Sequence, residues 1–274
     1  MSNTSNLLER NTEDVLAGVL ERTDNDLVVV DPSAQVVRAL IDIAADRDGD
    51  LPTLDVVADE RLLKDVMDDF LVAADAADLV DAGDLTLRNL DEDADNTILV
   101  GEDELYALVT AGDYVAALAA DDDSFIADAH ETYREVWADA DQFNLRTPAL
   151  SRVRETLSDE ISDEVRADFD GVLQSLEAAR GDGDGLDEVT ISLLVAAKND
   201  VLLYDISKWG EDAGIASKAT FSRTKTRLED MGLIDTEKVP IDVGRPRLRL
   251  KLGDDRLRGA DAGELASVAQ SMLN

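Results

Sequence analysis

The sequence predicts an α/β N-terminal domain, in which helices cover a mixed sheet, followed by a helical connector and a small C-terminal module. Three observations support this fold class. Short apolar runs alternate with amphipathic stretches over residues 1–123. Helical spacing of apolar residues replaces them over 124–180. After a break rich in Gly and Asp at 181–187, the local net charge changes sign.

The N-terminal domain, residues 1–123, is expected to serve sensing or assembly. Its sequence LVVV at 27–30 is a continuous apolar run that ends at Asp31-Pro32, which is typical of a buried strand. Crossover helices between such strands favour a parallel or mixed sheet. The expected elements are helix 6–22, strand 27–30, helix 33–47, strand 53–59, helix 60–80 and strands 85–90, 97–101, 105–111 and 114–120.

The connector, residues 124–180, carries apolar residues at helical spacing, among them Phe125, Tyr133 and Trp137. Two interpretations are open for these helices. The favoured one is that they join two subunits of a homodimer, for which they are long enough, and the alternative is that they simply cover the sheet of their own chain. The linker that follows, GDGDGLD at 181–187, weakly resembles a calcium loop, but it lacks the later ligands of such a loop.

Charge separates the last part of the chain from the rest. The protein has 62 acidic and 26 basic residues, a net charge of −36, which indicates either a halophile or an ordinary acidic protein. Residues 1–185 contain 13 Lys and Arg against 47 Asp and Glu, whereas residues 215–251 contain nine against five. This local surplus of four positive charges predicts a separate module with its own partner.

Residues 188–258 are expected to form three helices and a hairpin. Gly214 ends the second helix, Ser217 caps the third and Gly232 stops it, which is the spacing of a helix-turn-helix. In the stretch VGRPRLRLKLG, residues 243–253, cations alternate with leucines. A strand therefore places leucine on one face and positive charge on the other. A last helix is expected over 259–274.

This module has the residues that duplex DNA requires. Arg223 on the third helix is suited to guanine O6 and N7 in the major groove, and short hydroxyl side chains are suited to phosphates. Lys225 occupies a position where such helices usually bury an aliphatic residue. The expected DNA contacts are Ser217, Lys218, Thr220, Ser222, Arg223, Arg227, Arg245, Arg247 and Arg249.

The stretch GIASKATFSRTKTRLEDMGLID followed by GRPRLRLKL resembles the winged helix-turn-helix of archaeal and bacterial regulators. The whole chain resembles the TbsP-type haloarchaeal transcriptional regulators, which are relatives in plan of the sugar-responsive TrmB regulators. This resemblance implies control of carbon-metabolism genes and a second domain that responds to a small-molecule effector. TrmB-type regulators usually place the DNA-reading head N-terminally, whereas here it is C-terminal.

Other functions find little support. His130 is the only histidine, so catalytic triads and multi-histidine metal sites are excluded. Asp31 and Asp59 follow strands as in a phosphoacceptor receiver, but Lys64, the only lysine before the linker, lies in a predicted helix. No glycine-rich phosphate loop is present, and neither an enzymatic activity nor a cofactor is expected.

The expected partners are promoter DNA, a second copy of the chain and an effector. No apolar run approaches the ~18 residues that span a bilayer, and the N-terminus lacks a secretory pattern, so a cytoplasmic location is expected. The alternative function is a protein-interaction module whose winged helix contacts proteins rather than DNA.

Overall fold

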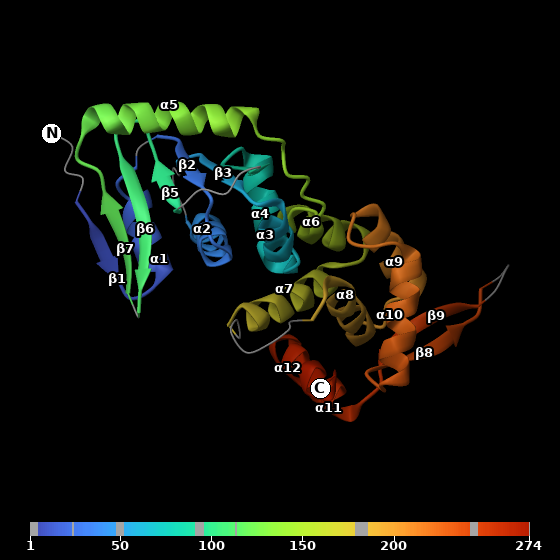
Figure 1. Cartoon of the computed structure of the whole chain (residues 1–274). Helices are drawn as coiled ribbons and strands as arrows, with labels where there is room; N and C mark the ends of the chain where they lie inside the picture. Colours follow the sequence, from blue (N-terminus) through green and yellow to red (C-terminus); the bar gives the residue numbers. More distant parts are fainter. Residues whose placement is uncertain are drawn as a thin grey trace. The chain divides into compact units, whose positions relative to one another are not determined.

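The computed structural model describes residues 5–23, 25–47, 52–90, 96–112, 114–178, 186–241 and 246–273. The chain forms two compact units, Met1–Leu145 and Arg146–Asn274 (Figure 1). The predicted connector 124–180 is therefore divided between them. Its first helix belongs to the N-terminal unit, and its other two helices belong to the C-terminal unit.

The N-terminal unit contains a seven-stranded sheet in the order β1-β7-β6-β5-β2-β3-β4. β2, β3 and β4 run parallel, whereas the pairs that involve β1, β7, β6 and β5 are antiparallel, which confirms the predicted mixed sheet. The strands are β1 (Leu7–Glu9), β2 (Leu27–Val30), β3 (Leu54–Ala58), β4 (Leu85–Asn89), β5 (Ile98–Val100), β6 (Leu105–Ala111) and β7 (Tyr114–Ala119).

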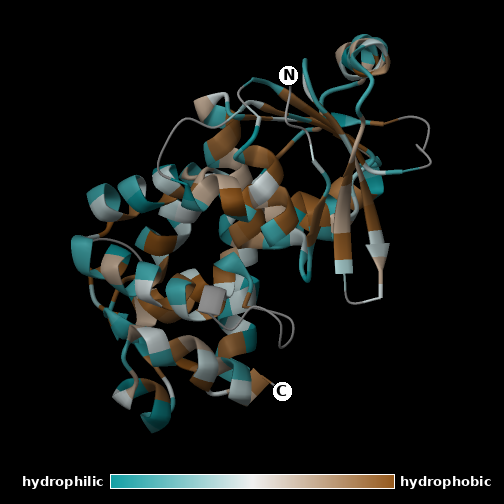
Figure 2. Ribbon diagram, turned by 90° about the vertical axis from the view of Figure 1, so that its left-hand side faces the viewer, coloured by the Kyte–Doolittle hydropathy of each residue, from teal (hydrophilic) through white to brown (hydrophobic). Residues whose placement is uncertain are grey.

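Helices cover the two faces of this sheet unequally. Four of them, α1 (Thr12–Leu20), α2 (Ala34–Asp46), α3 (Glu60–Met67) and α4 (Phe70–Ala82), pack with one face in the main apolar core. A single helix, α5 (Asp123–Asp139), contacts β2, β3 and β5 from the other face (Figure 1). Figure 2 shows hydrophobic residues concentrated in the strands and in the helices packed on them.

The predictions for two helices of this unit were wrong in their bounds. The predicted helix 6–22 begins only at Thr12, because Leu7–Glu9 instead pairs with β7 as an edge strand. The predicted helix 60–80 is two helices, because the chain breaks after Met67 and the Asp69 side chain caps a new helix by accepting a hydrogen bond from Leu71 N at 3.1 Å. The first departure follows from strand pairing with a distant part of the chain, and the second follows from a polar side chain that begins a new helix.

A polar network fixes α5 on the sheet. Asp55, buried on β3, forms an ion pair with Arg134 and accepts a hydrogen bond from Thr86 at 2.7 Å. Trp137 Nε1 donates to the same threonine at 2.9 Å. Arg88 donates to the carbonyls of Trp137, Ala138 and Ala140 at the end of α5. The apolar stripe of α5 thus faces its own sheet, as the second interpretation of this helix predicted.

The C-terminal unit is helical, with a two-stranded sheet. Helix α7 packs against α6, α8 and α12, and its apolar residues Phe169 and Leu173 are completely buried. The helices and strands of this unit are α6 (Leu150–Glu160), α7 (Asp163–Ala178), α8 (Glu188–Lys198), α9 (Leu203–Asp212), α10 (Lys218–Asp230), β8 (Ile234–Val239), β9 (Arg247–Leu252), α11 (Asp255–Gly259) and α12 (Ala262–Leu273).

Candidate nucleic-acid interface

Helices α9 and α10 form the predicted helix-turn-helix. Gly214 follows the end of α9 with a positive φ of 87°, a conformation that glycine adopts without strain. The Ser217 hydroxyl caps α10 by accepting a hydrogen bond from Thr220 N at 3.2 Å. Phe221 on α10 is fully buried and lies so close to Gly210 on α9 that a Cβ there would clash with its ring. The two helices therefore meet at a fixed glycine–aromatic contact.

One face of α10 is free for a ligand. Lys218, Ser222 and Arg223 are exposed, as expected, while Phe221 and Leu228 on the opposite side are buried. Ala219 and Thr226 share the exposed face, because residues three and four apart lie together on a helix. These two small side chains are not among the contacts predicted from the sequence, although their spacing from Ser222 and Arg223 indicates the same face.

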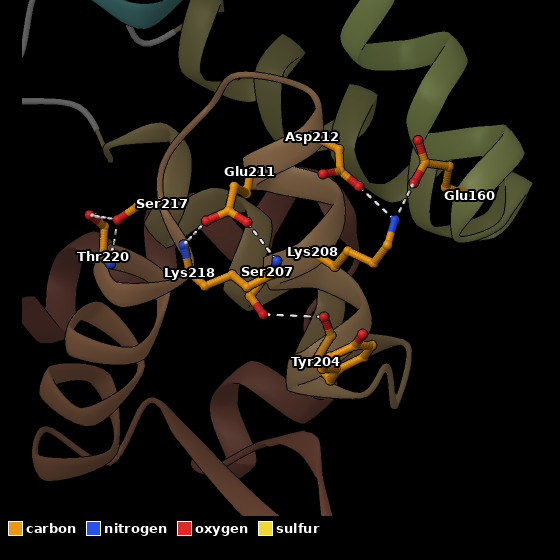
Figure 3. A network of polar contacts seen from close by, with 9 residues as sticks. All are labelled: Glu160, Tyr204, Ser207, Lys208, Glu211, Asp212, Ser217, Lys218 and Thr220. Atoms are coloured by element: carbon orange, nitrogen blue, oxygen red, sulfur yellow. Dashed lines mark hydrogen bonds and ion pairs between the residues drawn. The ribbon is translucent and has the colours of Figure 1, made fainter.

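The cations of this face differ in their partners. Lys218 Nζ lies 2.5 Å from Glu211 Oε2, and this hydrogen bond raises the pKa of Lys218 and lowers that of Glu211 (Figure 3). The Arg223 guanidinium, in contrast, has one side-chain partner among the described residues, Thr220 Oγ1 at 3.3 Å, and no ion pair. Arg223 is therefore the predicted base-reading residue, and no carboxylate of the described residues neutralises it.

Polar contacts also join the helix pair to the neighbouring helix α6 (Figure 3). Lys208 on α9 lies 2.6 Å from Asp212 and 3.9 Å from Glu160 on α6. The hydrogen bond to Asp212 is the main reason that the pKa of Lys208 is raised. Trp209 is buried and donates to Thr156 of α6 at 3.0 Å. These contacts hold α9 against α6 and leave the outer face of α10 uncovered.

Two cations of α10 point elsewhere. Arg227 lies 3.4 Å from Asp187 and 3.3 Å from Thr190 Oγ1, both at the start of α8. The side chain of Lys225 is only 13% exposed and reaches Glu229 at 2.6 Å, and Glu229 in turn accepts a hydrogen bond from Thr236 on β8. Lys225 thus snorkels along the helix, which explains a cation where an aliphatic residue was expected.

Strands β8 and β9 form the predicted hairpin. Their antiparallel register pairs Ile234 with Leu252 and Thr236 with Leu250. Leu250 and Leu252 are buried, and Leu250 N donates to Val201 O at 2.9 Å, so the leucine face packs against the helical unit. The hairpin tip, including the predicted contact Arg245, lies outside the described residues.

The charged face of β9 is paired within the chain. Arg247 lies 3.4 Å from Asp205, and its guanidinium stacks 4.3 Å from the centroid of the Tyr204 ring. Arg249 lies 3.9 Å from Glu237, and Lys251 lies 2.6 Å from Asp200. Exposed ion pairs of this kind contribute only about 0–1 kcal/mol, so a phosphate can replace the carboxylate at little cost.

The described residues include neither a cluster of metal-ligating side chains nor a helix that could span a membrane. They contain no group of three or more His, Cys, Asp or Glu side chains that could hold a metal ion. Among them, no helix is long and apolar enough to cross a membrane.

Two helices joined by a tight turn, a third helix behind them and a following hairpin define a winged helix-turn-helix domain. The chain belongs to the TbsP-like transcriptional regulator family. The N-terminal profile of that family matches residues 4–148, and the profile of its C-terminal helix-turn-helix domain matches residues 149–270. The junction of the two profiles lies close to the boundary between the two compact units.

The other comparisons add little. No curated protein matches the chain. A solved structure of TrmBL2, an archaeal chromatin protein described as showing a novel mode of DNA binding, is 19% identical with a TM-score of 0.36. The alignment covers 52% of this chain and 55% of that one, so this chain spans about half the length of TrmBL2. A TM-score this low carries no argument about fold or function.

Proposed function

We propose that the protein regulates transcription by binding promoter DNA, with α10 as the recognition helix in the major groove. The observation that carries this proposal is the exposed, unneutralised Arg223 on the free face of α10. Arginine contacts guanine O6 and N7 more often than any other side chain does. Ser222 and Thr226 flank it and supply hydroxyl groups on the same face. Lys218 approaches a phosphate at the helix N-terminus once Glu211 releases it.

The remaining predicted contacts take different roles in this proposal. Ser217 and Thr220 are hydrogen-bonded to one another at 3.0 Å, so they form the N-terminal cap that presents backbone N–H groups to a phosphate. Arg247 and Arg249 on β9 contact the DNA backbone by exchanging their carboxylate partners for phosphates. Arg227 orients α10 against α8 and touches DNA only at the edge of the interface. Arg245 remains a predicted contact of the hairpin tip.

The wider proposal is a cytoplasmic, non-enzymatic homodimer that controls carbon-metabolism genes in a halophilic archaeon. Acidic residues outnumber basic ones 62 to 26, which supports the halophile. The N-terminal unit senses a small-molecule effector or assembles the dimer. Two winged helices on one dimer match a palindromic operator, because operator symmetry mirrors protein symmetry.

Selection of bound sequences from a pool of random duplexes by the full chain tests the DNA-binding role. The expected result is enrichment of one G-containing half-site, with an affinity for it that falls as salt rises. Chromatin immunoprecipitation then names the controlled genes. Failure to retain any duplex at low or high salt would favour the alternative, a winged helix that contacts proteins.

A further inference from the structure

Part of the large sheet has an uncovered face. Helix α5 lies over β2, β3 and β5, and Leu105 at the start of β6 belongs to the same apolar cluster. Among the described residues, the rest of β6 and the strands β7 and β1 contribute no residue to that cluster. Alternate residues of β6 and β7, such as Tyr106 and Ala117, point into the main core. Their neighbours therefore point to the opposite side, where α5 covers Leu105 at the start of β6 but not the exposed residues farther along β6 and on β7.

The residues on that side are apolar and exposed. We name the open sheet face by its five members, Leu8, Val109, Tyr114, Ala116 and Leu118. The exposed fractions are 63% for Leu8, 40% for Val109, 46% for Tyr114 and 44% for Leu118, and Ala116 is half-buried. They are contiguous, because the register places Leu8 and Val109 on either side of Ala116. Three neighbouring strands of this length cover roughly 10 by 20 Å.

The charge of the open sheet face singles it out. None of its five residues is charged at neutral pH, although the chain carries a net charge of −36. Several exposed apolar side chains that adjoin one another on a protein surface form a candidate interface. A basic partner would find no carboxylate to recognise there, whereas a second copy of this acidic chain is repelled by every acidic part of the surface. An uncharged face is therefore where two copies can approach each other most closely.

The rim of the open sheet face carries a cation. Arg10 lies at its edge, with its guanidinium carbon 6.0 Å from the centroid of the Tyr114 ring, whereas Glu9 pairs with the core residue Val115 and so points to the other face of the sheet. In a two-fold contact each copy contributes the same patch, so Arg10 of both copies lies at the edge of the apolar contact. The apolar residues of α6 and α7 are buried in the C-terminal unit, and those of α5 face its own sheet except Phe125, which is 56% exposed.

We propose that the open sheet face is the homodimer interface, covered by the same face of a second copy across a two-fold axis. This inference rests on the proposed function in one respect only, namely that a dimer brings two DNA-binding domains to one operator. The patch serves as the apolar centre of the contact, and the polar rim brings the area towards the ~800 Å² per partner of a standard interface.

Salt should strengthen this dimer. The two copies repel through their acidic surfaces, and the Debye length falls from about 10 Å at 0.1 M to about 3 Å at 1 M salt. Apolar burial is not weakened by this screening. Dimerisation should therefore increase with salt, whereas binding to DNA phosphates should decrease.

Sedimentation equilibrium of the full chain in rising KCl, without DNA, tests the proposal. The wild type should be a dimer at molar salt, and Leu118→Asp should be a monomer at the same concentration. Ile241→Asp is the matched control, because Ile241 is also 40% exposed but lies in the C-terminal unit. A wild type that stays monomeric at every salt concentration overturns the proposal, as does a Leu118→Asp variant that remains a dimer.

A cross-linking experiment keeps the test valid if Leu118→Asp misfolds. The chain contains no cysteine, so Ala116→Cys introduces a single thiol at the centre of the open sheet face. A short bismaleimide should link two Ala116→Cys chains at high salt and leave Ile241→Cys chains mostly unlinked. Equal linkage of both variants contradicts the interface. DNA binding by the Leu118→Asp monomer to one half-site is measured separately, so failure of the dimer and failure of the regulator role remain distinguishable.

Discussion

Replacing Arg223 by alanine isolates the proposed base contact. The guanidinium is exposed, and its one described partner is the Thr220 hydroxyl at 3.3 Å. Removing such a side chain leaves the folded protein nearly unchanged, with a change in unfolding free energy within about 0.5 kcal/mol. Any large loss of DNA affinity is then a property of the complex rather than of the fold.

The expected loss follows from the contact itself. A bidentate arginine–guanine pair contributes about 1–3 kcal/mol of discrimination against other bases. At about 1.4 kcal/mol for each factor of ten, this corresponds to roughly a 5- to 150-fold weaker affinity for the selected half-site. Binding to random duplex should fall much less, because Arg223 then loses only a nonspecific electrostatic contact.

Fluorescence anisotropy with a labelled selected duplex and a random duplex measures both affinities at fixed salt. Arg227→Ala is the matched control, because Arg227 lies on the same helix but contacts Asp187 and Thr190 of α8. It should lose little sequence preference. Equal losses on both duplexes for Arg223→Ala would refute the base-reading role, and so would a larger loss of preference for Arg227→Ala.

Three further predictions concern the fold around the interface. Gly210→Ala should destabilise the protein by about 1–3 kcal/mol in urea unfolding, because the new methyl group clashes with Phe221; an unchanged midpoint would contradict the contact. Lys225→Met should change stability by less than ~1 kcal/mol and leave DNA affinity intact, because Lys225 pairs with Glu229 on the side of β8; a loss of affinity would place it in the groove. Burial raises the pKa of Glu188 above its ordinary value of 4.5, so the folded state binds this proton more tightly than the unfolded state does. The free energy of unfolding therefore falls as the pH rises from about 4.5 through the raised pKa. Glu188→Gln should therefore raise the melting temperature at neutral pH and lose this effect in acid. A stabilisation that grows in acid would contradict the raised pKa of Glu188.

Local patterns were enough to predict much of the fold. The apolar run at 27–30 is β2, and a strand is also found within the predicted range 53–59. The helix-turn-helix could be predicted because Gly214 and Ser217 carry their signals in the residues themselves, a positive φ and a side-chain cap. Such signals act within a few residues, so one sequence reveals them.

Features that depend on distant residues could not be predicted in this way. Leu7–Glu9 is a strand only because β7, more than a hundred residues later, pairs with it. The partners of the basic residues are also distant, since Arg247 meets Asp205 and Lys251 meets Asp200. The alternation of cations and leucines on β9 therefore predicted the two faces correctly, but it did not indicate that the charged face is neutralised by the chain itself.

The ion pairs of β9 change the number of salt cations that DNA binding releases. The two arginines and the lysine of β9 already have carboxylates beside them, so these cations are paired before DNA binds. When a phosphate arrives, the displaced carboxylates take up cations from the solvent, and this uptake offsets part of the cation release from DNA. The affinity of such a protein should consequently depend on salt less steeply than the number of its basic contacts suggests.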